Sequence, residues 1–181
     1  MKSQLHLRQD HRINRISAIL SLLILLSGQS FSGTDLADRF AVIAPSAEKS
    51  FDRHFMVVRR GKRMDSMLLV APVTIHAPLA GSEPNTMFEC LATPVFNVGD
   101  GMRLDVLLKT GGSERLLFTR YFDAARRAED RDWIPLSIPL AAPGVSASEL
   151  VMRLSGGPNG DLTADWLALA SVRLTQRTQS P

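Results

Sequence analysis

The residues best suited to chemistry in this sequence lie between Arg120 and Trp133. Four carboxylates stand there among four arginines, namely Asp123, Glu129, Asp130 and Asp132 with Arg120, Arg126, Arg127 and Arg131. Two carboxylates at a set separation can act as the acid and base of a glycoside hydrolase. Because arginines alternate with these carboxylates, we interpret the stretch as a loop ordered by ion pairs. Mixed charge without a histidine or a nucleophile favours recognition or loop ordering over catalysis.

Catalytic and cofactor-binding motifs are absent from the rest of the sequence. It contains no Gly-x-Ser-x-Gly, His-Glu-x-x-His or phosphate-binding glycine–lysine motif. The glycine-rich segment 97–101 precedes a predicted strand and therefore lacks the helix amides that hold phosphate. His76 alternates with Val73 and Ile75, so we expect it to be exposed and idle. We predict no enzymatic activity, no catalytic or metal-ligating residue and no cofactor.

Cys90 is the only cysteine. An intramolecular disulfide and a two-cysteine metal or redox motif are therefore impossible. Phe88 and Cys90 alternate with Glu89 on a predicted strand, which places both inside the protein. We predict a buried, structural cysteine.

Alternating apolar residues run along most of the chain. Met102–Leu108 and Glu114–Phe122 alternate with period two, and paired glycines separate them, which is typical of a β-hairpin. A second hairpin is expected over residues 55–70, with its turn at Gly61. Further strands are predicted at residues 73–77, 86–92, 133–140, 150–154 and 167–175. Eight or nine short strands with Gly and Pro between them predict an all-β, antiparallel two-sheet jelly-roll sandwich.

The same alternation predicts the core. We expect one buried set, comprising Leu104, Val106, Leu136, Ile138, Met152, Leu154, Trp166 and Val172. Trp166 is included because it has the parity of Val172 and Leu174. Trp133 has the opposite parity to Ile134 and Leu136, which leaves its exposure open.

The first thirty residues resemble a targeting signal. Lys2, Arg8, Arg12 and Arg15 precede an uncharged apolar run at residues 16–26. That run is shorter than the roughly twenty apolar residues a membrane-spanning helix needs, and it has the length of a secretory signal. We predict a signal peptide, or an uncleaved anchor, at residues 1–32 and a periplasmic or extracellular protein. Residues 33–54 are expected to form a short helix and a connector, with Thr34 capping a helix that reaches Ile43. Residues 55–175 form the sandwich domain, and residues 176–181 form a disordered tail.

The signal also explains the charge. The chain has 21 basic and 18 acidic residues, a net charge of +3. The first fifteen residues hold four of the basic side chains and one acidic one, so the remainder is balanced and indicates no affinity for nucleic acid. One basic cluster remains, at Arg53, Arg59, Arg60, Lys62 and Arg63. It is either a solvated hairpin or a site for an acidic polymer or lipid head group.

The order of these strands and loops resembles the galactose-binding-domain-like jelly rolls of exported bacterial envelope proteins. The resemblance covers residues 55–174. It rests on the proline-flanked strand 71–78, the loop 97–101, the segment 117–123 with the loop 128–133, and residues 156–161 before Asp165-Trp166. It departs from the usual pattern at Pro139, where an acidic residue often stands.

The resemblance implies a non-catalytic module that binds carbohydrate or an envelope polymer through loops at one end, and some members hold a structural calcium. The ligand-binding residues we expect are Arg120, Tyr121, Asp123 and Trp133. The alternative is an accessory or interaction subunit of a membrane-associated glycan-processing complex. Either way, the membrane is contacted only through the N-terminal segment.

Overall fold

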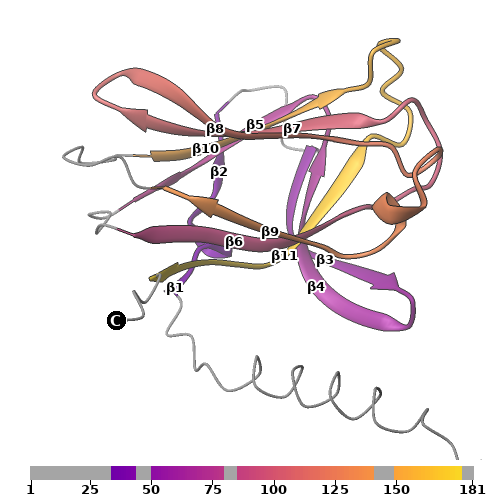
Figure 1. The fold of residues 1–181 in the computed structure, drawn as a ribbon, viewed down its shortest axis with the longest axis horizontal. Helices are drawn as coiled ribbons and strands as arrows, with labels where there is room; N and C mark the ends of the chain where they lie inside the picture. The colour runs from indigo at the N-terminus through magenta and orange to yellow at the C-terminus, as the bar shows by residue number, and fades with distance from the viewer. Residues whose placement is uncertain (1–33, 44–49, 80–84, 141–148, 177–181) are drawn as a thin grey trace, which may run out of the picture. The chain divides into compact units, whose positions relative to one another are not determined.

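The computed structural model describes residues 34–43, 50–79, 85–140 and 149–176, which form two antiparallel sheets packed face to face (Figure 1). Sheet A has the order β3 (Phe51–Arg59), β4 (Lys62–Val70), β11 (Trp166–Gln176), β6 (Thr86–Pro94) and β9 (Ile134–Pro139), and β1 (Thr34–Asp35) pairs with β11. Sheet B has the order β2 (Ala41–Val42), β5 (Val73–Pro78), β10 (Glu149–Gly156), β7 (Met102–Thr110) and β8 (Ser113–Phe122). The predicted antiparallel sandwich is confirmed.

Both predicted hairpins are present. Strands β7 and β8 meet at Gly111 and Gly112, which have φ values of 55° and 86°. Strands β3 and β4 meet at Arg60 and Gly61, with φ values of 47° and 77°. Left-handed backbone at both central residues matches the twist of the flanking strands, which is why glycine stands in each turn.

The core lies between the sheets and is built from inward positions of both. Seven of the eight predicted core residues are buried there, namely Leu104, Val106, Leu136, Ile138, Met152, Leu154 and Val172. Cys90 is a free, buried thiol, as predicted, and its burial raises the pKa of the thiol to about 12.

The eighth core prediction, Trp166, is wrong. The register of β11 against β6 shifts between Ala170 and Arg173, and Ser171 takes a φ of 53° in this irregularity. Leu167 and Leu169 point inward before the shift, whereas Val172 points inward after it. Because one extra residue reverses the alternation, Trp166 lies on the outer face of sheet A, the face turned away from sheet B.

The predicted helix near Leu36 is present but much shorter than expected. Only Ala37–Arg39 is helical, as one 3-10 turn (η1), and the strands β1 and β2 flank it. Leu36 and Phe40 are fully buried at the two ends of this turn, and the N–H of Leu36 donates to Val172 O. Strand pairing and burial of two large side chains therefore outweigh the local helical pattern.

Strand pairing extends from Thr34 to Gln176, whereas the predicted signal and nearly all of the predicted tail lie outside the described residues. No helix in the described part of the chain has both the length and the apolar character needed to cross a bilayer.

Candidate functional site

Two of the four predicted ligand-binding residues, Arg120 and Asp123, meet through the carboxylate of a third residue, Asp130. Arg120, near the end of β8, donates from Nη2 to Asp130 Oδ1 at 2.7 Å. The backbone N–H of Asp123 donates to the other oxygen of Asp130 at 2.8 Å. Asp130 is fully buried and belongs to the 3-10 turn η3 (Ala128–Arg131). It therefore fastens the loop that follows β8 to the strand itself.

The side chain of Asp123 is also used within this loop. It is buried, and its carboxylate accepts from the backbone N–H of Arg126 at 3.1 Å and from Arg126 Nη1 at 3.2 Å. Arg131 donates to the carbonyl oxygens of Ala124 and Ala125. The ion-pair loop expected from the sequence is thus present, and both Arg120 and Asp123 help to order it.

Tyr121 and Trp133 lie apart from that pair. Tyr121 faces the opposite side of β8, where its hydroxyl donates to the Asp100 carbonyl and Arg127 lies 5.8 Å from its ring centroid. Burial, reinforced by the charges of Asp123 and Asp100, raises the pKa of Tyr121. Trp133 is half-buried just before β9, and among the described residues its indole Nε1 has no hydrogen-bond partner. Ligand binding by these four residues stays a prediction.

A different set of aromatic side chains gathers on the outer face of sheet A. The ring centroid of Trp166 lies 5.2 Å from that of Phe96 and 6.5 Å from that of Phe55, both edge-to-face. We call these three residues the aromatic cluster. Phe96 is 40% exposed, and Trp166 is half-buried. Sequence reasoning missed the cluster because the irregularity at Ser171 has no glycine to mark it.

Cationic side chains border the aromatic cluster. Arg59, at the end of β3, donates from Nη2 to the carbonyl oxygens of Pro94 and Val95, next to Phe96. Partial burial lowers the pKa of Arg59, and the charge of Asp132 opposes that shift. Arg60 in the adjoining turn pairs with Asp132, with Nε 3.2 Å from Oδ2. These contacts hold the β3–β4 turn beside the end of β6 and the loop before β9.

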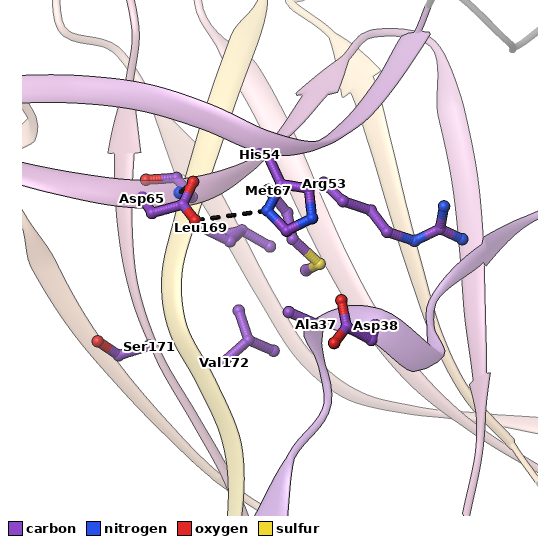
Figure 2. Close-up of a pocket in the computed structure, with 10 residues that line it drawn as sticks. Ala37, Asp38, Arg53, His54, Asp65, Met67, Leu169, Ser171 and Val172 are labelled. Carbon is purple, nitrogen blue, oxygen red and sulfur yellow. Dashed lines mark hydrogen bonds and ion pairs between the residues drawn. The ribbon is translucent and has the colours of Figure 1, made fainter.

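A separate pocket of about 230 Å³ opens where β4 diverges from β11 (Figure 2). Met67, Leu169 and Val172 form its apolar floor. His54 and Asp65 face each other on its rim, 3.4 Å apart between Nδ1 and Oδ2. Arg53 points away from this pair, and its guanidinium donates to Phe40 O at 2.6 Å. The pocket places the exposed imidazole of His54 beside the carboxylate of Asp65, and Asp38, Ser66 and Ser171 also line it.

Two buried carboxylates lie beneath the loop between β10 and β11. Asp165 is fully buried and both of its oxygens lack a hydrogen-bond partner in the described part of the protein. Burial raises the pKa of Asp165 to about 6, helped by the charges of Asp100 and Asp161. Asp100 accepts from the N–H of Asn159 at 2.8 Å. Across the described ranges, no three His, Cys, Asp or Glu side chains are grouped as metal ligands would be.

His76 also differs from expectation. Its side chain is only 32% exposed, and Nδ1 lies 3.6 Å from Glu149 Oε2, which also pairs with Lys109 Nζ at 3.0 Å. Cross-strand neighbours on the outer face of sheet B therefore surround the ring, and His76 is a member of a charged ladder.

Comparison with known proteins identifies the architecture. No family model matches the chain. An uncharacterized protein from Archaeoglobus fulgidus is 29% identical over 68 residues, which is 38% of this chain, and the chain spans 17% of that relative's length. Among solved structures, the CBM22-1–GH10 modules of Clostridium thermocellum endo-1,4-beta-D-xylanase 10B, complexed with xylohexaose, match with a TM-score of 0.51. That match covers 80% of this chain and 27% of the other, at 10% identity.

The fold is an antiparallel two-sheet jelly-roll sandwich. The CBM51 of Clostridium perfringens GH95, solved with methyl-galactose, is a further similar structure, at 14% identity and a TM-score of 0.49 over 81% of this chain and 93% of that one. Sequence identities this low show a shared fold only. The chemistry of the site depends on the side chains of this chain.

Proposed function

We propose that the protein is an exported, non-catalytic module that binds carbohydrate or an envelope polymer. The aromatic cluster carries this proposal. Phe96 and the half-buried Trp166 lie on the outer face of a sheet, where sugar rings can pack their apolar C–H faces against them. Xylohexaose bound in the similar xylanase structure supports the same class of ligand.

The carboxylates of the β8–β9 loop support a non-catalytic role. Asp130 is bonded to Arg120 and to the backbone of Asp123, and Asp123 is bonded to Arg126. A glycosidase needs one carboxyl group free to donate a proton and a second free to attack or to activate water. Asp123 and Asp130 are both occupied by structural contacts instead.

Export is the part of the proposal that rests on the sequence alone. The basic residues before the apolar run 16–26 favour secretion, followed by residence in the periplasm or outside the cell. A polymer-binding module is useful where such polymers are found, so the two parts of the proposal are consistent. No cofactor is required for binding of this kind.

A panel of soluble polysaccharides in affinity electrophoresis tests the function. We expect at least one to retard the protein, and Trp166→Ala to weaken that binding by about 1–3 kcal/mol, as is usual for aromatic residues that dominate an interface. Trp133→Ala is the matched variant. It removes the indole of the Arg120–Trp133 region, where the sequence predicted ligand binding. If only Trp133→Ala weakens binding without lowering the melting temperature, the ligand lies at Arg120–Trp133 and not on the aromatic cluster.

An accessory subunit of a membrane-associated glycan-processing complex is the second candidate. Met56 and Val58 favour it, because they are 44% and 55% exposed on the edge strand β3. Apolar side chains exposed on a strand edge are typical of a protein interface. If the chain binds no polysaccharide, and Met56→Ser with Val58→Ser raises its solubility without changing its stability, this function is the better one.

A further inference from the structure

The turn between β3 and β4 carries an excess of positive charge. Arg59, Arg60, Lys62 and Arg63 lie within five residues that include no acid. Within the described ranges only Arg60 has a carboxylate partner, Asp132, whereas Lys62 and Arg63 are exposed and make no ion pair. Four strand cations elsewhere are compensated, in the pairs Arg103–Asp105, Lys109–Glu149, Arg153–Glu114 and Arg173–Glu89. The turn therefore produces a local positive field, although basic and acidic side chains are equal in number beyond the first fifteen residues.

The register of the hairpin decides which of these cations adjoins the aromatic cluster. Phe55 pairs with Ser66 and Arg59 pairs with Lys62, so Phe55, Arg59 and Lys62 share the outer face of sheet A. Arg63 pairs with Val58 and faces the other way. The contacts of Arg59 with the Pro94 and Val95 carbonyls hold this end of the hairpin next to Phe96.

We propose that the ligand of the aromatic cluster is an acidic polysaccharide built from uronic acids. Its sugar rings pack against Phe96 and Trp166, and a carboxylate of a neighbouring ring pairs with the ammonium group of Lys62. This inference rests on the proposed function, since it names the class of glycan bound at the same site. Lys62 is exposed, so its attraction to a carboxylate is screened by salt.

The test compares two polyuronates with their uncharged forms. Polygalacturonate and alginate are offered to the full chain beside their neutral esters, at low and at physiological salt. We expect at least one acid form to bind about tenfold or more tightly than its ester, with an advantage that shrinks as salt is added. Lys62→Gln should weaken binding of the acid form several-fold and leave the ester unaffected. Arg63→Gln is the control, because it removes the same charge one residue away on the opposite face.

Each other outcome has a distinct meaning. If neutral polysaccharides bind and neither acid form binds better than its ester, the acidic class is wrong and the proposed function stands. If Lys62→Gln and Arg63→Gln weaken binding of the acid form equally, the attraction is a general effect of charge. That result would refute the pairing of Lys62 with a ligand carboxylate. Binding to phosphatidylglycerol vesicles but to neither polyuronate would assign the turn to a lipid surface and refute the inference. If no polysaccharide of any charge binds, the inference and the proposed function both fail.

Discussion

Arg120 and Asp130 are joined by a hydrogen-bonded ion pair of 2.7 Å in which the Asp130 side chain is fully buried and the Arg120 side chain is 32% exposed. The second oxygen of Asp130 accepts the backbone N–H of Asp123, so one side chain satisfies two donors from the end of β8. A buried charge that is deprived of its partner is costly, which makes this pair sensitive to truncation on either side.

Asp130→Ala should therefore destabilise the protein by about 3–5 kcal/mol, because it leaves Arg120 unpaired and one buried N–H unsatisfied. Chemical denaturation measures the loss. Glu129→Ala is the matched control, since Glu129 is exposed in the same turn and should change stability by less than about 0.5 kcal/mol. Equal stability of the two variants would show that Asp130 does not fasten the loop.

Because the pKa of Asp165 is raised, we expect the stability of the protein to depend on pH. This pKa is about 6 in the folded protein, against 3.8 for an ordinary aspartate, so the folded state binds this proton more tightly than the unfolded state. The resulting stabilisation is complete below about pH 4 and is lost as the pH rises through 6. We expect Asp165 to make the protein roughly 2–3 kcal/mol less stable at pH 7.5 than at pH 4, other groups aside.

Asp165→Asn isolates that contribution, because an amide has no proton to lose in this range. Denaturant midpoints measured from pH 4 to pH 7.5 should fall less for this variant than for the parent protein. Glu129→Gln serves as the control, since Glu129 is exposed and its charge is not among those that raise the pKa of Asp165. Parallel pH profiles for the parent and Asp165→Asn would contradict the raised pKa.

Two glycines with similar backbone angles should differ in their tolerance of alanine. Gly101 has a φ of 92°, and an added Cβ would lie 2.6 Å from the carbonyl oxygen of Phe122. Gly112 has a φ of 86°, with no atom within 4 Å of an added Cβ. Gly112→Ala should cost about 1 kcal/mol from backbone strain alone, whereas Gly101→Ala should cost about 1–3 kcal/mol more from the overlap. Melting temperatures report the difference, and equal shifts would refute the overlap.

The predicted signal can be tested with a fusion. Residues 1–34 joined to a reporter that is active only outside the cytoplasm should give activity. Leu22→Arg with Leu25→Arg should abolish it, because each arginine costs roughly 2.5–3.5 kcal/mol on insertion scales. Leu22→Ile with Leu25→Ile preserves the apolar run and should remain active. A reporter that is inactive when fused to the unaltered segment would refute export.

The sandwich could be predicted from the sequence because buried apolar and exposed polar residues alternate along its strands. Leu104 and Val106 alternate with Arg103 and Asp105, and the paired glycines at 111–112 mark the reversal of direction. Such signals are local, and the hairpins and seven of the eight predicted core residues follow from them. The class of fold was therefore accessible without any long-range information.

The candidate site was less accessible, because its residues are assembled by irregularities and long-range contacts. Trp166 lies on the outer face because the register of β11 shifts at Ser171. Serine is not a residue type that indicates left-handed backbone in a sequence. Arg120 and Tyr121 are neighbours in sequence but lie on opposite faces of β8, so a cluster in the sequence did not become one surface. Phe55 and Trp166 are far apart in the chain, and only the pairing order β3-β4-β11 brings them together.

The pairing of β1 with the far end of β11 fixes the position of Thr34 relative to the aromatic cluster. Thr34 is level with Leu174, whereas Trp166 begins the same strand eight residues earlier (Figure 1). At about 3.3 Å per residue, the strand separates the two positions by roughly 25 Å. The aromatic cluster therefore lies at the opposite end of β11 from Thr34, the first residue that the structure describes.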